Sequence, residues 1–418
     1  MSVNLIMPFI AGSLAVKLTT ALLSLVVYAV YAHLLTPEQF GLLALTLSVG
    51  LLLSAIAKLG LENLIIRFGA QFNPNDLSRL YTVCICLVFV SSSVLFFLMC
   101  LFSEQIVSWL STAQLQSLLP YLGLYILLNS LQAINAALLN ALHKARLSMA
   151  LSGFVSNVFI LLGLFIFKPS SAHSAFIIIL LCMLVSLIVS YVFCFYYCLP
   201  KLNGILKLPF SNLAIANKHF FVISLSAIFT QQISSILVAK YSSLEDVAML
   251  AIAIKVATLF SYPLQAVNAV CAPKYAKLSQ MLEIEKIKKI ATETRLLLTA
   301  IASIGLLVVF LFIEPFLNLL SHDYIGAVIY VKILAVGQWV NLCSGSAVSI
   351  LLMTGHERLH QYQNLLITCL FLIFLWLTIP FFGALAASVL MTLSLSAKNL
   401  ISAYYVSKRV FKMKIHDF

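Results

Sequence analysis

Charged side chains stand inside long apolar segments of the chain, among them Lys17, Lys58, Lys255, Lys398 and Glu62. A charged side chain in hydrocarbon costs about 2.5 to 3.5 kcal/mol on the insertion scale, so each should face a wet cavity or a partner. The surplus of ammonium groups would attract anions: at about 4 Å, a pyrophosphate oxygen gains on the order of 4 kcal/mol at an effective dielectric near 20. We therefore predict that the four lysines are substrate-binding cations of a cavity.

Structural roles are the alternative for two of these lysines. Lys58 and Glu62 are one helical turn apart and can pair with each other. Lys17 lies in the inner third of a long first helix, from which its ammonium could reach the headgroups. Both alternatives remain open at this point.

Two apolar segments, 120–142 and 328–353, each carry a stripe of uncharged polar side chains. Amides suit hydrogen bonding to sugar hydroxyls in a water-filled vestibule, but they join neighbouring helices equally well. Together with Glu62, we predict the following residues as candidate sugar or coupling contacts: Asn129, Gln132, Gln231, Gln338 and Asn341.

One motif has the appearance of a metal site. Residues His356 to His360 read H-E-R-L-H, the spacing with which two histidines bind zinc and a glutamate acts as base. Such a site needs a third ligand, and the only acid after Glu357 is Asp417. We expect no metal, with a membrane zinc protease kept as the less favoured alternative.

Other catalytic signatures are missing from the sequence. The nine cysteines form no C-x-x-C pair, and there is no phosphate-binding loop or dinucleotide fingerprint. We predict no catalytic residues and no cofactor. Transport by this chain would not use ATP bound to it, whereas coupling to a proton or sodium gradient stays open.

The elements that position these residues follow from composition. Of the 418 residues, 62% are hydrophobic and 9% charged, with a mean hydropathy of +1.08, which indicates an integral membrane protein and excludes a soluble enzyme. The apolar segments are long and continuous, as in membrane helices, not alternating as in barrel strands. We predict an all-α protein with twelve membrane-spanning helices, at 8–34, 41–66, 81–102, 120–142, 148–167, 175–198, 219–239, 247–270, 296–318, 328–353, 362–380 and 383–406.

The basic residues predict the orientation. There are 25 Lys+Arg against 13 Asp+Glu, a net charge of +12. With the amino terminus inside, the inner segments hold 18 basic residues and the outer segments 3. Because cytoplasmic loops are enriched in Lys and Arg, we predict that both termini are cytoplasmic. The same bias explains the positive charge without a nucleic-acid partner.

An internal repeat predicts two lobes. Residues Thr36–Leu45 align with Ser243–Ile252 at an offset of 207, and Arg67-Phe68 then falls on Lys274-Tyr275. Units with an even number of spans share one orientation and are related by an axis along the membrane normal. We predict two six-helix lobes, residues 1–205 and 206–418, with a cavity between them.

Two stretches carry a family resemblance. A-H-L-L-T-P-E-Q-F-G (Ala32–Gly41) and G-L-E-N-L-I-I-R-F (Gly60–Phe68) resemble the polysaccharide-exporter branch of the MATE-like (MOP) superfamily, and in particular the bacterial O-antigen flippases of the Wzx type. Members commonly have Arg where this chain has His33. The resemblance implies a MATE-like fold and a cavity lined by basic residues, although Lys58 alone of the four lysines lies beside the quoted motif.

The resemblance also implies an activity. Such proteins are not enzymes; they translocate an undecaprenyl-pyrophosphate-linked oligosaccharide, the O-antigen repeat unit, from the inner to the outer leaflet of the bacterial inner membrane by alternating access. The implied partners are the lipid-linked glycan, the bilayer and the polysaccharide polymerase machinery. The alternative within the same fold is a cation-coupled multidrug antiporter, which would need membrane-embedded acids such as Glu62.

Overall fold

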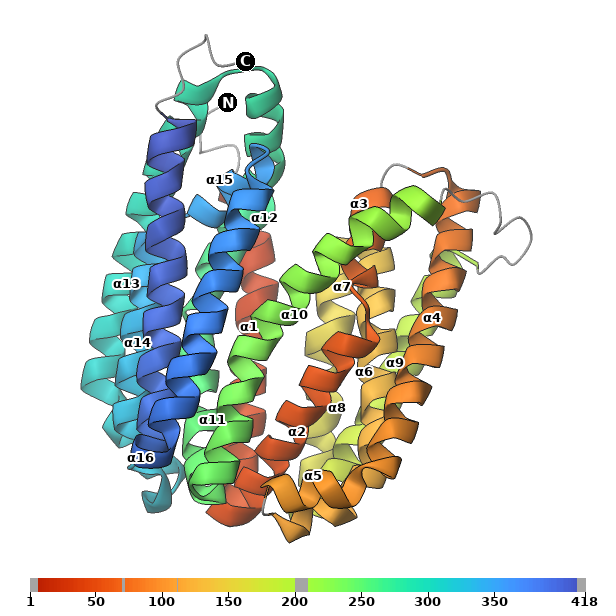
Figure 1. Cartoon of the computed structure of the whole chain (residues 1–418), viewed down its shortest axis with the longest axis vertical. Helices are drawn as coiled ribbons and strands as arrows, with labels where there is room; N and C mark the ends of the chain where they lie inside the picture. The colour runs from red at the N-terminus through yellow and green to blue at the C-terminus, as the bar shows by residue number, and fades with distance from the viewer. Residues whose placement is uncertain (1–6, 70–71, 111, 200–209, 412–418) are drawn as a thin grey trace. The chain divides into compact units, whose positions relative to one another are not determined.

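The computed structural model describes residues 7–69, 72–110, 112–199 and 210–411, and these form helices and turns without a strand (Figure 1). Eight of the helices are long and apolar enough to cross a membrane, or up to ten if each of two bent pairs is one span. Each of the twelve predicted segments falls on described helices. The prediction of an all-α, multi-pass membrane protein is therefore confirmed.

Contacts within the chain divide it into two compact units, which are described separately below. Unit 1 comprises Met1–Ala21 and Met249–Phe418, and unit 2 comprises Leu22–Ala248. The predicted lobe division at 205/206 stays a prediction, and α10 (Phe210–Tyr241), which it assigns to the second lobe, packs in unit 2 against α2 and α3.

Unit 2 is built around α6, which contacts α2, α3, α4 and α9. Membrane helices approach closely where one side is a glycine, and a Cβ at Gly123 of α6 would lie 2.0 Å from the Phe96 ring. The helices of this unit are α2 (Pro37–Ala57), α3 (Leu61–Gly69), α4 (Pro74–Leu101), α5 (Ser103–Leu110), η2 (Ala113–Ser117), α6 (Leu119–Ala141), α7 (Ala145–Met149), η3 (Ala150–Phe154), α8 (Val155–Phe167), α9 (Ala172–Tyr197), α10, and the second part of α1 (Met7–Leu34).

In unit 1, α14 packs between α13 and α16 (Figure 1). A buried apolar core joins α12, α13, α14, α15 and η6, with Tyr275, Leu298 and Leu351 fully buried in it. The helices are the first part of α1, α11 (Leu244–Leu259) from Met249 onward, α12 (Ser261–Gln280), α13 (Ile284–Leu320), η5 (His322–Tyr324), α14 (Ala327–Cys343), α15 (Ala347–Met353), α16 (Glu357–Tyr405) and η6 (Val406–Val410).

Helix α16 contains both of the last two predicted spans. Its continuity is broken at Gly383, whose φ of 49° and ψ of −130° are not helical. Lys398 contacts Thr368, so residues equally far before and after Gly383 meet. The two halves therefore form an antiparallel hairpin, and glycine is suited to the corner because it tolerates positive φ without steric cost.

The proposed repeat has matching helix caps. Thr36 Oγ1 accepts a hydrogen bond from the Gln39 amide at 3.4 Å, and Ser243 Oγ accepts one from the Asp246 amide at 3.1 Å. Both pairs are related by the offset of 207 found in the sequence. Such caps satisfy amides at the start of a helix that lack an intrahelical acceptor. The matched decapeptides thus begin helices in the same way.

Candidate functional site

The second predicted span, 41–66, is broken where its charged residues lie. Helix α2 ends at Ala57 with Lys58 as its C-cap, and Leu59 (φ 51°) and Gly60 (φ 76°) both have left-handed backbones before α3 starts. The prediction of one continuous helix is wrong here, because left-handed residues end an α-helix. Since the 21 residues of α2 alone extend about 30 Å, Lys58 lies at the end of a span-length helix.

Lys58 and Glu62 form an ion pair across this break. The Lys58 Nζ to Glu62 Oε2 distance is 3.1 Å, and the two side chains are 12% and 23% exposed. The pairing that the sequence left open is therefore present. An ion pair with little water around it is sensitive to the loss of either partner, because the remaining charge is left without compensation.

Side chains from neighbouring helices satisfy the backbone at the break. Ser91 of α4 donates to the Ala57 carbonyl at 2.6 Å, and Asn217 of α10 donates to the Leu59 carbonyl at 2.7 Å. Asn63 also donates to Ser224 of α10 at 2.8 Å. Non-helical backbone between apolar helices is tolerated where protein groups satisfy its hydrogen bonds. Sequence reasoning missed these partners, because a single polar residue in an apolar helix does not identify the carbonyl that it contacts.

Two of the other predicted cations bind neutral partners in unit 1. Lys17 Nζ donates to Gln265 Oε1 at 2.9 Å, which joins α1 to α12, and Gln265 in turn donates to Ser261 at 2.9 Å. Lys398 Nζ donates to Thr368 Oγ1 at 3.2 Å across the α16 hairpin. Neither contact neutralises an ammonium charge, so both lysines keep the ability to attract an anion.

Lys398 also borders a polar cluster within the hairpin. Gln363 Nε2 hydrogen-bonds Ser402 Oγ and lies 3.1 Å from His360 Nδ1, and all three of these residues are buried. Polar groups between apolar helices hold those helices in one register when they are hydrogen-bonded. His360 of this cluster is also the second histidine of the H-E-x-x-H motif.

The H-E-x-x-H motif begins at the start of α16. His356 is the N-cap residue, and its Nδ1 lies 3.2 Å from Thr354 Oγ1, whereas His360 contacts Gln363. Within the described residues, no group of three or more His, Cys, Asp or Glu side chains is arranged to hold a metal ion. The two histidines thus each have a local polar neighbour.

The fourth predicted cation, Lys255, is half-buried on α11 in unit 1. Its helix neighbours Ile252 and Val256 are buried at 3% and 6% exposure. The structure therefore places Lys17, Lys255 and Lys398 in unit 1, and the Lys58–Glu62 pair in unit 2.

The amides that were predicted as sugar contacts make mostly short-range bonds. Gln132 donates to the Leu151 carbonyl at 2.9 Å and so joins α6 to η3. Asn129 lies 3.4 Å from the Tyr125 hydroxyl, and Asn341 donates to Gln338 at 3.1 Å, each within one helix. These contacts favour the packing interpretation for Gln132. Gln231 is exposed on α10.

Comparison with known proteins identifies a matching protein family. A family model described as polysaccharide biosynthesis protein matches residues 10–279. Among curated proteins, none matches this sequence.

Solved structures with a similar fold cover nearly the whole chain. An inward-facing multidrug resistance MATE family transporter of the MOP superfamily has a TM-score of 0.76 at 13% identity, over 96% of each chain. The lipid II flippase MurJ, in an inward closed conformation, has a TM-score of 0.74 at 13% identity, over 94% of this chain and 87% of that one. A MOP superfamily transporter from Pyrococcus furiosus has a TM-score of 0.61 at 13% identity, over 96% of this chain and 93% of the other. At this identity the likeness shows the fold, and the predicted MATE-like fold is confirmed.

Proposed function

Because the chain belongs to the polysaccharide biosynthesis protein family, we propose that it is a flippase for an undecaprenyl-pyrophosphate-linked oligosaccharide, the O-antigen repeat unit. It would move this lipid from the inner to the outer leaflet of the bacterial inner membrane. The observation that carries the proposal is the surplus of ammonium groups in the membrane segments. Of these, Lys17 and Lys398 bind neutral partners, which leaves their charges uncompensated by those contacts.

The proposed mechanism follows from the chemistry of the substrate. A polyprenyl pyrophosphate carries a negatively charged head and a bulky sugar that hydrocarbon excludes, while its tail is soluble in lipid. Lysines in a polar path would hold the pyrophosphate, and two lobes would open alternately to each side. The likeness to a lipid II flippase supports the fold for such a path. Both termini would be cytoplasmic, a proton or sodium gradient would drive the cycle, and polymerase machinery would receive the product.

The first test removes single ammonium groups. We expect Lys255→Ala, Lys398→Met and Lys58→Ala each to slow translocation by at least roughly tenfold, because a hydrogen bond to a charged group contributes about 1.5 to 3 kcal/mol. The measurement is surface polysaccharide in a strain that lacks the gene and is complemented with each variant. The amount of protein in the membrane is measured in parallel.

Lys289→Ala is the matched control, because Lys289 is an exposed lysine of α13 outside the predicted span. It should leave surface polysaccharide unchanged. Normal polysaccharide in all three single variants and in the Lys58→Ala/Lys255→Ala double variant would refute the proposal.

The multidrug antiporter remains the alternative because a MATE transporter shares the fold. Cation coupling would need a membrane carboxylate, and Glu62 is already paired with Lys58. We expect a deletion strain to show unchanged susceptibility to a panel of cationic drugs. Increased susceptibility that the wild-type chain reverses, and Glu62→Gln does not, would favour the antiporter instead.

A further inference from the structure

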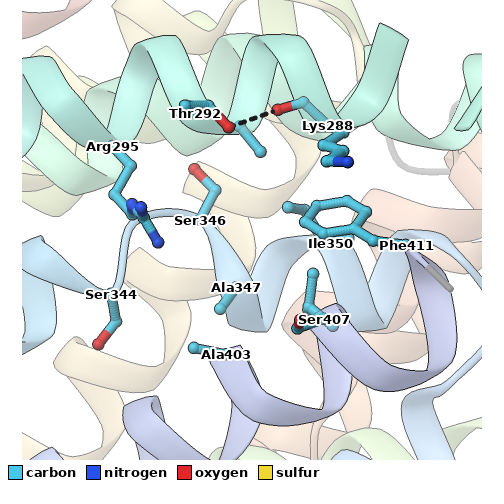
Figure 2. Close-up of a pocket in the computed structure, with 12 residues that line it drawn as sticks. Lys288, Thr292, Arg295, Ser344, Ser346, Ala347, Ile350, Ala403, Ser407 and Phe411 are labelled. Atoms are coloured by element: carbon cyan, nitrogen blue, oxygen red, sulfur yellow. Dashed lines mark hydrogen bonds between the residues drawn. The ribbon is translucent and has the colours of Figure 1, made fainter. Parts of the chain in front are cut away.

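Unit 1 contains a pocket of about 210 Å³ between the start of α13 and the end of α16 (Figure 2). Lys288, Thr292 and Arg295 line one wall, and their spacing of four and three residues places them on one face of α13. The opposite walls are the loop between α14 and α15, with Ser344 and Ser346, and the end of the hairpin, with Ala403 and Ser407. Figure 2 shows these side chains around one space.

The polar half of the described lining consists of two cations and four hydroxyl side chains, and the other half is apolar. Lys288 and Arg295 form no ion pair with any described residue, and the α13 acids Glu285 and Glu293 are not among the lining residues. Ser346 is 2% exposed, and its hydroxyl makes no hydrogen bond to the backbone of the described residues. A buried donor beside two cations is suited to a group with several acceptor oxygens, such as a phosphate.

Some of the other lining hydroxyls are already engaged. Thr292 Oγ1 donates to the Lys288 carbonyl at 2.9 Å, and Ser344 Oγ donates to the Val340 carbonyl at 2.8 Å. The donors that remain for a ligand are Lys288, Arg295, Ser346 and Ser407. An Arg fork beside a Lys provides more than three N–H donors, enough for one phosphate.

The position of the pocket along α13 indicates the source of the phosphate. Arg295 is the last charged residue before the predicted span 296–318, and Leu296 and Ile304 beyond it are 65% and 66% exposed on the helix surface. An arginine at that boundary lies at the depth of lipid headgroups. A phosphate at the same depth belongs to a lipid, whose chains can lie along the exposed apolar surface of α13.

We propose that this pocket binds the phosphate of an anionic phospholipid headgroup. The two cations hold the phosphate oxygens, and the Ser346 hydroxyl supplies a buried donor. The bound lipid links α13, the α14–α15 loop and the end of α16 at one end of unit 1. This site is separate from the residues assigned to the flippase proposal and does not depend on it.

The test is binding of dihexanoyl-phosphatidylglycerol to the purified full chain in an uncharged detergent, measured by isothermal titration calorimetry. We expect saturable binding that the Lys288→Gln/Arg295→Gln variant weakens on the order of 30-fold, because each basic residue near an anionic headgroup strengthens binding about fivefold. The Lys277→Gln/Lys289→Gln variant removes two exposed charges outside the pocket and should bind within about twofold of wild type.

A second variant keeps every charge. Ala403→Leu adds bulk to the pocket wall and should also weaken binding at least about tenfold. If the Lys288→Gln/Arg295→Gln variant does not purify as a folded protein, Ala403→Leu alone tests whether the pocket binds the lipid. Equal weakening by the Lys277→Gln/Lys289→Gln variant, or unchanged binding in Ala403→Leu, would overturn the proposal in favour of diffuse charge attraction. Equally tight binding of inorganic phosphate, or of dihexanoyl-phosphatidylcholine, would overturn the assignment to an anionic lipid.

Discussion

Replacing Glu62 by leucine should lower the free energy of unfolding by about 2 to 3 kcal/mol, because it leaves the Lys58 ammonium without its partner in a site that is 12% exposed. Lys58→Met should cost a similar amount, since Glu62 is then left uncompensated. The Lys58→Met/Glu62→Leu double variant should recover most of the loss, because two apolar side chains replace both charges. The measurement is thermal unfolding of each purified variant in detergent.

A second ion pair provides the control. Lys286 and Glu283 lie 2.8 Å apart, three residues apart in the sequence where Lys58 and Glu62 are four apart, and their side chains are 66% and 35% exposed. Removing Glu283 should change the stability by less than about 1 kcal/mol, as for other surface pairs. If Glu62→Leu were as mild as Glu283→Leu, the pair at the helix break would have no special structural role.

The double variant also separates folding from transport. It removes the Lys58 charge while restoring the stability of the break, so a folding defect no longer obscures a transport defect. The flippase proposal predicts reduced surface polysaccharide in this variant. Normal polysaccharide would show that Lys58 serves the structure alone, and would leave Lys17, Lys255 and Lys398 as the candidate substrate cations.

Replacing Gly41 by alanine should destabilise the protein by at least about 2 kcal/mol. A Cβ at Gly41 would lie 1.7 Å from the Leu244 carbonyl oxygen, which belongs to the backbone and cannot rotate away. The clash outweighs the roughly 1 kcal/mol that alanine gains over glycine inside a helix. The expected result is a lower unfolding midpoint and less protein in the membrane fraction.

Gly123→Ala is the matched control. Its added Cβ would lie 2.0 Å from Phe96, but that neighbour is a side chain that is 39% exposed and can change rotamer. We expect a change of at most about 1 kcal/mol. Equal effects of the two substitutions would show that the approach of α2 to the start of α11 is not tight in the folded protein.

Gly41 connects the sequence motif to a contact in the structure. It ends the stretch A-H-L-L-T-P-E-Q-F-G, and its contact residue Leu244 lies in the matched copy of the repeat. The predicted spans begin within both stretches, at residues 41 and 247, and the caps at Thr36 and Ser243 act only on their immediate neighbours. The sequence could not show that the two copies touch.

The sequence by itself determined that the chain is an all-α membrane protein, which segments are helical, and that Lys58 and Glu62 can pair. These properties depend on local hydropathy and on spacings of a few residues, and the bilayer admits helices for such segments because they satisfy their own backbone. Only the tertiary structure showed that Asn217 satisfies the Leu59 carbonyl, that Lys17 binds Gln265, and that Arg295 and Ser407 line one pocket. Each of these pairs joins residues more than a hundred positions apart in the sequence. Such contacts produce no periodic pattern in the sequence, because they depend on how whole helices pack against one another.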